Sequence, residues 1–170
     1  MATPRRLDLA FAVKSLACGA HHSVVLTEDG QLYGCGLATQ GQLGLIEETL
    51  QGRVPPCNQL YPQMAHMPLQ SASGIIQVAC GDNFTIALSA SGNIYSTGHG
   101  GYGIHGAGAD ELASRYQFAP VGHGGEGYFK ARQIKYISAG ENHCGAIDAN
   151  GNAYTWGLNA SGQCGVAGQR

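Results

Sequence analysis

Seven histidines and six cysteines are the side chains of this sequence that could bind a metal or transfer a proton. No two cysteines have the C-x-x-C spacing of zinc sites. The histidines show no H-x-x-x-H spacing, and spacing alone supports no Ser-His-Asp arrangement. The sequence therefore predicts no catalytic residue, no metal and no cofactor. We expect the cysteines to be small buried residues of a protein in a reducing compartment. They are Cys18, Cys35, Cys57, Cys80, Cys144 and Cys164.

A glycine-rich motif from Gly98 to Gly103 has the G-x-G-x-x-G spacing of dinucleotide-binding loops. In those loops a helix must follow, because its N-terminus receives the charge of the phosphates. A strand is expected before this motif, but no helix is expected after it. Its first and last glycines also recur elsewhere in the chain, at Gly36, Gly41, Gly157 and Gly162, so the motif is interpreted as structural.

These glycines belong to a segment that occurs three times, at intervals of about 60 residues, which is typical of a repeat architecture. The copies run from Ala17 to Gly44, from Ala79 to Gly106 and from Ser138 to Gly165. One tyrosine and five glycines keep their places in every copy. A structural role is assigned to the first glycine of each copy and to the tyrosine, that is, to Gly19, Gly81, Gly140, Tyr33, Tyr95 and Tyr154.

Three strands are predicted in each copy. The first ends in small residues at Ala17-Cys18, Ala79-Cys80 and Ser138-Ala139. The second alternates with a period of two and covers His22 to Leu26, Phe84 to Leu88 and His143 to Ile147. One face of this strand carries large apolar side chains, and the other carries small ones. Because neither face is strongly polar, both are expected to be covered. The face with small side chains allows another sheet to approach closely.

A glycine turn should separate the second strand from the third. Asp29-Gly30, Ser91-Gly92 and Asn150-Gly151 suit the positive φ of a two-residue hairpin. The third strand then covers Gln31 to Cys35, Asn93 to Thr97 and Asn152 to Trp156. All three tyrosines lie in these strands and are expected to be largely buried, with equivalent orientations.

The connecting segments have room for a fourth, outer strand. Met64 to Leu69 and Tyr116 to Val121 are the candidates, and each holds a proline, which an edge strand tolerates. Single helical turns are expected at Ile46 to Leu50 and Asp110 to Tyr116. The predicted fold is all-β, a partial β-propeller of three four-stranded blades built from repeats of about 60 residues. The blades cover about 13–75, 76–136 and 137–170 of a single domain, with 1–12 as a possible outer strand of a preceding blade.

The repeat resembles the regulator of chromosome condensation repeat: a small residue, Cys-Gly, two variable residues, His, aliphatics, Asp-Gly, Tyr and then a glycine cluster. The third copy, with Trp156-Gly157 and Gly162-Gln163-Cys164-Gly165, is the most similar to the family pattern. The second copy departs most, since Phe84 replaces the histidine. The resemblance implies a structural role for His22, His143 and Trp156, with buried imidazoles that bond backbone groups. Family propellers usually have seven blades, so three blades are expected to be a piece of a longer ring or an arc that other chains complete.

The resemblance also points to the short loops between the first and second strands. In a propeller such loops gather on one end of the ring. In a family member that exchanges nucleotide on the GTPase Ran, acidic and histidine residues of these loops face the GTPase. The corresponding partner-binding candidates here are His21, Asp82, Asn83, Glu141 and Asn142. The alternative is that they are ordinary solvated loop residues.

The composition limits the partners. The net charge is −2 and only 12% of residues are charged, so the basic stripe of a nucleic-acid binder is absent. No apolar run of about 18 residues is present, so no membrane partner is expected. The location is expected to be intracellular, cytoplasmic or nuclear. Open blade faces favour association, so the partners are a protein or further copies of the chain in a homo-oligomer.

Three functions remain open from the sequence. The leading hypothesis is a non-enzymatic module that presents its blade loops to a protein partner. The second is a fragment of a guanine-nucleotide exchange factor for a small Ran-like GTPase. The third is the propeller domain of a larger HECT-type ubiquitin ligase. The sequence beyond residue 170 would separate them.

Overall fold

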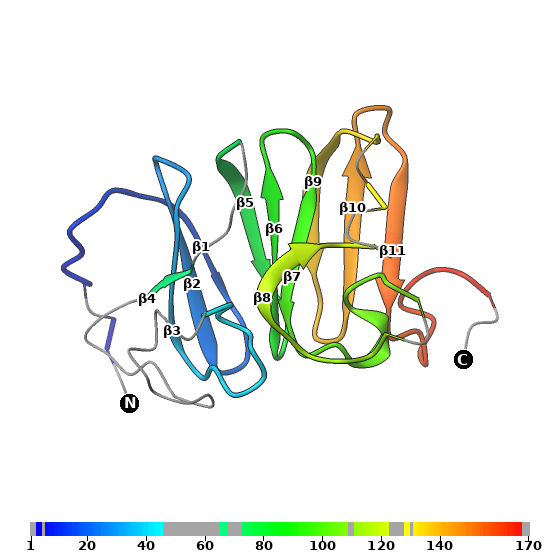
Figure 1. Cartoon of the computed structure of the whole chain (residues 1–170), viewed down its shortest axis with the longest axis horizontal. Coiled ribbons are helices and arrows are strands. Elements are labelled where there is room, and N and C mark those ends of the chain that lie inside the picture. The colour runs from blue at the N-terminus through cyan, green and yellow to red at the C-terminus, as the bar shows by residue number, and fades with distance from the viewer. Residues whose placement is uncertain are drawn as a thin grey trace.

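The computed structural model describes residues 3–4, 6–45, 65–67, 73–108, 111–122, 128–129 and 131–167. Within them the chain forms three antiparallel sheets that stand side by side in chain order (Figure 1). We call these sheets blades 1, 2 and 3. This arrangement is the predicted all-β, partial β-propeller.

Blades 1 and 2 have four strands each, and blade 3 has three within the described residues. Their strands pair in simple chain order. Blade 1 consists of β1 (Val13–Cys18), β2 (His22–Thr27), β3 (Leu32–Gly36) and β4 (Ala65–Met67). Blade 2 consists of β5 (Ile75–Cys80), β6 (Phe84–Ser89), β7 (Ile94–Gly98) and β8 (Arg115–Pro120). Blade 3 consists of β9 (Ile134–Ala139), β10 (His143–Asp148) and β11 (Ala153–Gly157).

The predicted strands are confirmed to within one or two residues for the first three strands of every repeat. The outer strands β4 and β8 lie within or next to the two proline-containing segments proposed for them. The helical turn expected at 110–116 is wrong, because residues 111–114 are irregular and β8 begins at Arg115. A short 3-10 helix, η1 (Gly101–Gly103), lies earlier in that connection. The turn expected at 46–50 lies outside the described residues.

Each blade packs the face with its large side chains against the face of the next blade that carries small side chains. We call the face that carries Val24 and Leu26 the trailing face, and the opposite face, which carries Val25, the leading face. Val24 and Leu26 of β2 pack with Val78 and Ala87 of blade 2, and all four are buried. Burial of each large aliphatic side chain contributes roughly 1.5–3 kcal/mol. The period-two pattern therefore correctly predicted the close approach on the face with small side chains, and both faces of blade 2 are covered.

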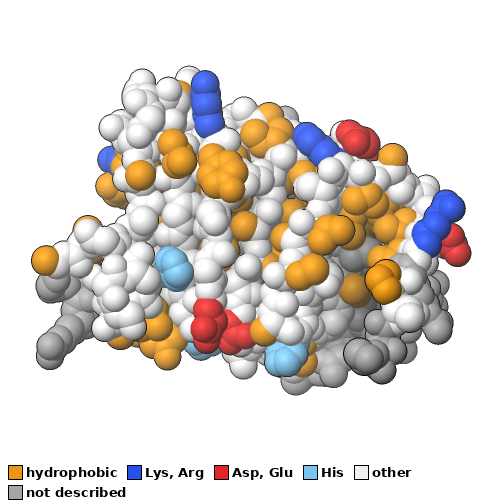
Figure 2. All heavy atoms as spheres, turned by 180° about the vertical axis from the view of Figure 1, so that it is seen from behind, with side chains coloured by type: hydrophobic (Ala, Val, Ile, Leu, Met, Phe, Trp, Pro, Cys, Tyr) orange, Lys and Arg blue, Asp and Glu red, His pale blue; other side chains and the backbone are white. Residues whose placement is uncertain are grey.

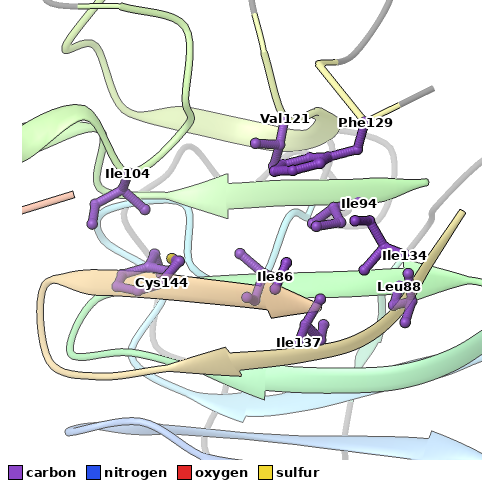
Figure 3. Packing of buried hydrophobic residues seen from close by; sticks show 11 residues of the cluster. Ile86, Leu88, Ile94, Ile104, Val121, Phe129, Ile134, Ile137 and Cys144 are labelled. Atoms are coloured by element: carbon purple, nitrogen blue, oxygen red, sulfur yellow. The ribbon is translucent and has the colours of Figure 1, made fainter. Parts of the chain in front are cut away.

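The same arrangement recurs between blades 2 and 3. Ile86 and Leu88 of β6 lie against Ile137 of β9 and Cys144 of β10, as Figure 3 shows. Val121 and Phe129, from the connection between the two blades, close the cluster on one side. Two successive interfaces of the same kind thus hold the three blades together.

The hairpin turns differ from the prediction. They have four residues between the strands, and only the glycine has positive φ, at 81° in Gly30, 81° in Gly92 and 84° in Gly151. The reason is a side chain at the end of the second strand that accepts a hydrogen bond from the start of the third. Thr27 Oγ1 accepts from Gln31 N–H at 2.9 Å, and Asp148 Oδ1 accepts from Asn152 N–H at 2.9 Å. This bond widens the loop and leaves one left-handed position for glycine.

The three tyrosines have equivalent places but are half-buried instead of largely buried. Each pairs with the same position of the preceding strand and lies on the leading face. Tyr33 stacks on Phe11 with ring centroids 4.2 Å apart, and Tyr154 packs edge-on against Phe129 at 5.5 Å. The segment that precedes a blade therefore covers these tyrosines only in part.

The N-terminal segment forms no strand in residues 3–4 and 6–12. Phe11 lies on Tyr33, and Ala12 accepts a hydrogen bond from the N–H of Glu28 at 3.1 Å. This part of the chain thus covers the outer part of the leading face of blade 1. Among the described residues, no helix is long and apolar enough to cross a membrane.

Candidate functional site

The three loops that join the first and second strands of the blades lie in a row at one end of the molecule. We call residues 19–21, 81–83 and 140–142 the loop row. Backbone hydrogen bonds link its members: Ala20 N–H donates to Asp82 O at 3.3 Å, and Asp82 N–H donates to Glu141 O at 2.9 Å. Ala20, Asp82 and Glu141 occupy equivalent positions, so one repeated bond sets the spacing of the loops.

A second set of bonds fixes each loop to its own blade. The carbonyl groups of His21, Asn83 and Asn142 accept hydrogen bonds at 2.8–2.9 Å from the N–H groups of Leu37, His99 and Leu158. These donors follow the third strand of each blade. Both sets of bonds use backbone atoms only, so they do not depend on which side chains the loops carry.

The structure places all five partner-binding candidates in the loop row. The side chains of His21 and Glu141 are exposed, and those of Asp82, Asn83 and Asn142 are half-buried. Neighbouring amides orient both carboxylates: Asn83 Nδ2 donates to Asp82 Oδ2 at 2.8 Å, and Asn142 Nδ2 donates to Glu141 Oε1 at 3.4 Å. Acidic side chains lie near histidines along one edge of the surface in Figure 2. The row can accept hydrogen bonds and attract positive charge.

Each loop begins with a glycine because an aromatic or imidazole ring lies against it. A Cβ atom at Gly19 would overlap the ring of His22, one at Gly81 the ring of Phe84, and one at Gly140 the ring of His143. None of these glycines has positive φ. Their structural role is therefore close approach and not an unusual backbone conformation.

Between blades 1 and 2, a buried histidine bonds to the next blade. His22 Nε2 lies 3.1 Å from Thr85 Oγ1, and Thr85 Oγ1 donates to Gln42 O at 2.7 Å. His22 is 3% exposed, and its Nδ1 has no hydrogen-bond partner among the described residues. The predicted burial is confirmed for His22, and its ring also bonds a side chain of the neighbouring blade.

Between blades 2 and 3, different residues occupy the same positions. Phe84 and Cys144 stand where His22 and Thr85 stand in the first interface, and both are buried in the apolar cluster of Figure 3. Cys144 does not supply the hydroxyl that Thr85 gives to Gln42 O. Instead, Trp156 Nε1 donates to Ile104 O at 2.8 Å, and Ile104 is the residue equivalent to Gln42. The structural role expected for Trp156 thus includes a bond between blades.

Two residues close to the loop row were not singled out from the sequence. Gln42 is fully buried, and its Nε2 donates to Asn83 Oδ1 at 3.3 Å. His105 is also fully buried, with Nδ1 3.0 Å from Ser96 Oγ and Nε2 3.1 Å from Gly98 O. Both residues lie inside the recurring Gly-x-x-Gly segment of their repeat, and this position could have pointed to them.

Burial keeps the side chains of the blade interfaces uncharged. Loss of hydration lowers the pKa of His22 to about 4, and the same effect, with the nearby charge of Arg115, lowers the pKa of His105 to about 4. Burial raises the pKa of Cys80 to about 12 and also raises the pKa of Cys144. Both histidines are therefore neutral, and both thiols protonated, at neutral pH.

Metal-binding chemistry has no support in the described part of the chain. No group of three or more His, Cys, Asp or Glu side chains could hold a metal ion there. His143 is half-buried on the trailing face of blade 3, and His21 is exposed on the loop row. The five described cysteines are all free thiols: Cys18, Cys35, Cys80, Cys144 and Cys164.

Comparison with known proteins gives one consistent result. The Regulator of chromosome condensation (RCC1) repeat matches residues 29–88, and a second description of the same repeat matches residues 13–42, 75–104 and 134–163. The chain is 35% identical over 156 residues to the ultraviolet-B receptor UVR8 of Arabidopsis thaliana, which covers 91% of this chain and 31% of the relative.

Two human proteins are also similar. The X-linked retinitis pigmentosa GTPase regulator is 30% identical over 151 residues, covering 89% of this chain and 13% of the relative. The E3 ubiquitin-protein ligase HERC2 is 28% identical over 200 residues, covering 90% of this chain and 4% of the relative. The chain thus spans less than a third of the length of these curated relatives.

A solved structure shares the fold. Prp20p from Saccharomyces cerevisiae superposes with a TM-score of 0.73 at 24% identity, over 92% of this chain and 36% of that protein.

Proposed function

The chain belongs to the regulator of chromosome condensation repeat family, and on that basis we propose that it is a protein-interaction module whose loop row contacts a protein partner. The observation that carries the proposal is the pair of backbone bonds from Ala20 to Asp82 and from Asp82 to Glu141. They hold polar side chains of three blades at a fixed spacing on one end of the molecule. A surface of variable side chains on a constant frame suits recognition of another protein.

The five loop residues have distinct roles in this proposal. Asp82 and Glu141 attract basic side chains of the partner, and Asn83 and Asn142 orient these carboxylates through the hydrogen bonds already described. His21 adds an exposed imidazole at the end of the row. The partner surface that fits them is basic, and attraction between such surfaces raises the association rate more than the final affinity.

The module is proposed to be non-enzymatic, to need no cofactor or metal and to bind neither nucleic acid nor membranes. Its low charge, with a net value of −2, supports the exclusion of nucleic acid. The five free thiols support a reducing compartment, so the proposed location is intracellular, in the cytoplasm or the nucleus.

Nucleotide exchange on a small Ran-like GTPase is the second candidate. It is favoured by the similarity to a GTPase regulator and to Prp20p, whose structure was described with its binding properties to Gsp1p and histones. The similarity to a ubiquitin ligase favours a third candidate, in which the blades recognise a protein for a catalytic domain elsewhere. In all three cases the loop row would contact a protein.

Charge reversals at the two ends of the blades test the proposal. Glu141 lies on the loop row, whereas Glu28 lies in the β2–β3 turn at the opposite end of a blade, and both side chains are exposed. We expect Glu141→Lys combined with Asp82→Lys to weaken binding of protein partners at least tenfold, and Glu28→Lys to leave it unchanged. Quantitative affinity purification of the three proteins from the same cell extract measures this difference. Equal recovery of every partner by all three proteins would contradict the role of the loop row.

A separate assay decides between simple binding and exchange. A purified Ran-type GTPase loaded with a fluorescent GDP releases its nucleotide faster only in the presence of an exchange factor. Acceleration by the chain, lost in the Asp82→Lys and Glu141→Lys protein, would establish the exchange candidate. Binding of the GTPase without acceleration supports the interaction module.

A further inference from the structure

The buried amide of Gln42 lies between the glycine segment of blade 1 and the loop of blade 2 that carries Asp82. Its Oε1 accepts a hydrogen bond from the N–H of Gln40 at 2.8 Å, and its Nε2 donates to Asn83 Oδ1 at 3.3 Å. The side chain of Gln42 is fully buried. Gln42 therefore joins two blades by a side-chain bond that reaches the loop row.

A backbone group sets the direction of these bonds. A backbone N–H can only donate, so the N–H of Gln40 requires the oxygen of the Gln42 amide and turns the NH2 group of that amide toward Asn83. The NH2 group of Gln42 in turn requires the oxygen of the Asn83 amide. The NH2 group of Asn83 is then left to donate to Asp82 Oδ2, at 2.8 Å. We call this series, from Gln40 N–H through Gln42 and Asn83 to Asp82, the amide relay.

The main chain of Gln42 is also held by blade 2. Thr85 Oγ1 donates to Gln42 O at 2.7 Å, and Thr85 is fully buried. Thr85 stands two residues after Asn83, near the start of β6. One short segment of blade 2 thus bonds both the carbonyl and the side chain of Gln42. The position of the Gln42 amide relative to the loop is therefore fixed at two points.

The equivalent position in blade 2 carries no amide. Ile104 stands where Gln42 stands, and its side chain has no donor for Asn142 in the loop of blade 3. The bond from Asn142 Nδ2 to Glu141 Oε1 is 3.4 Å long, against 2.8 Å for the corresponding bond to Asp82. A hydrogen bond of that length is weaker. The two carboxylates of the loop row are thus held differently, because only one of them is oriented from the preceding blade.

We propose that Gln42 is a positioning residue for the loop row, and that it makes Asp82 the fixed anchor for one basic side chain of the partner. The inference rests on the function proposed above for the loop row. A carboxylate that is oriented before binding loses less entropy in the complex, so Asp82 contributes more affinity than Glu141. Glu141 keeps more freedom and adapts to the partner. Every group of the amide relay belongs to blades 1 and 2, which pack against each other within the chain.

Two substitutions interrupt the amide relay at its buried member. Gln42→Met keeps nearly the length of the side chain and removes its donor and its acceptor. Gln42→Ile introduces the residue that blade 2 carries at the same position, where Ile104 is fully buried, so the fold accommodates isoleucine there. Gln163→Met is the matched control. Gln163 Oε1 accepts from the N–H of Ser161 at 2.9 Å, as Gln42 Oε1 does from Gln40, but among the described residues its Nε2 makes no bond to the loop row.

Nuclear magnetic resonance of the side-chain amides tests the positioning without a partner, because nitrogen relaxation reports how freely each NH2 group moves. We expect the order parameter of Asn83 Nδ2 to be about 0.8 in the original chain and to fall below about 0.6 in both Gln42 variants. The Asn142 amide should stay unchanged in every protein, and Gln163→Met should change neither amide. An Asn83 amide that stays rigid in both Gln42 variants, or an Asn142 amide that loosens equally, would overturn the proposal.

Titration with a short peptide that carries two arginine residues connects the positioning to recognition. We expect Asp82→Asn and Gln42→Met each to weaken binding about fivefold, and Glu141→Gln and Gln163→Met to weaken it less than about twofold. In the presence of Asp82→Asn, Gln42→Met should have no further effect, because Gln42 acts through this carboxylate.

The outcomes separate the role of Gln42 from the function of the loop row. If Asp82→Asn weakens binding of the peptide and Gln42→Met does not, Gln42 is not a positioning residue, and the loop row remains the binding surface. Additive losses from the two substitutions would also overturn the proposal. Equal binding by the original chain and Asp82→Asn would instead contradict the function proposed for the loop row itself.

Discussion

The ring of Phe84 lies against Gly81 so closely that a single added Cβ atom at Gly81 would overlap three ring carbons. Phe84 is itself 1% exposed and packed in the cluster between blades 2 and 3, so its ring cannot move aside. We therefore expect Gly81→Ala to lower the free energy of unfolding by about 2–3 kcal/mol, the cost of overpacking a fixed site. Urea denaturation followed by circular dichroism measures it.

Gly145 provides the control for this substitution. It lies in β10 of blade 3 and, like Gly81, has no positive φ, but an added Cβ would meet only Tyr154 O at 3.8 Å. Gly145→Ala should change the stability by less than about 1 kcal/mol, because alanine meets no close atom and restricts the unfolded chain. Equal losses from the two substitutions would show that the Phe84 ring does not set the requirement for glycine.

A second prediction concerns the two equivalent positions at which the interfaces carry different residues. Phe84→His or Cys144→Thr alone places a polar group against an apolar neighbour, and we expect each to cost about 1–3 kcal/mol. The double variant recreates the pair formed by His22 and Thr85. Its cost should be smaller than the sum of the single costs by about 1 kcal/mol or more.

Urea denaturation of the original chain and the three variants completes this double-mutant cycle. Additive losses would mean that the His22–Thr85 arrangement cannot be transferred between interfaces. The same cycle on Phe84 and the distant Leu112, replaced by alanine, is the control and should be additive.

The backbone pattern was predictable because it depends on local signals. Period-two alternation set the second strands, and small residues set the ends of the first strands. The turn was wrong in detail, because the sequence did not show that Thr27 and Asp148 would bond the start of the next strand. The tyrosines were predicted as core, but the segments before each blade cover them only in part.

The third prediction concerns the indole of Trp156, the one tryptophan of the chain. Trp156→Phe removes the donor to Ile104 O and leaves that carbonyl without its bond from blade 3. We expect a loss of about 1–3 kcal/mol, since an unsatisfied buried acceptor retains its desolvation cost. Thermal unfolding followed by circular dichroism measures the change.

Tyr102→Phe is the control for this aromatic substitution, because Tyr102 is exposed on η1. It should leave the unfolding temperature within about 1–2 °C of the original. A Trp156→Phe protein as stable as this control would show that the bond to Ile104 contributes nothing.

The fourth prediction is a loss of stability between pH 6.5 and pH 4. The pKa values of His22 and His105 are lowered to about 4 in the folded chain, while the unfolded chain titrates near 6.5. In this window the unfolded state binds more protons, so stability falls as the pH falls. The expected loss at pH 5 is about 1–2 kcal/mol for each histidine.

His22→Phe should remove the share of this loss that belongs to His22. Urea denaturation at pH 7 and at pH 5 should show a difference about half that of the original chain. Asn152 and its neighbours lower the pKa of Asp148 to about 2 from 3.8, so this carboxylate reduces stability only at still lower pH. An unchanged stability between pH 7 and pH 5 in the original chain would contradict the neutral, buried state of both histidines.

The position of the candidate site could be predicted from the sequence, but the hydrogen bonds that join its loops could not. Equivalent loops of a repeat must lie at the same end of their blades, so the five loop residues could be chosen from the sequence. The bond from Ala20 to Asp82 could not, because it joins residues about 60 positions apart. The contacts of His22 and Trp156 with a neighbouring blade have the same origin, since one repeat read alone does not show its neighbour.

The two blade interfaces have the same shape and different chemistry, and this fixes the order of the repeats. A copy of blade 2 inserted after blade 1 keeps the match of His22 with Thr85. Two copies of blade 2 in succession would set Phe84 against a threonine hydroxyl, with no tryptophan to reach Ile104 O. Duplication or shuffling of whole repeats therefore needs compensating changes at the new boundary.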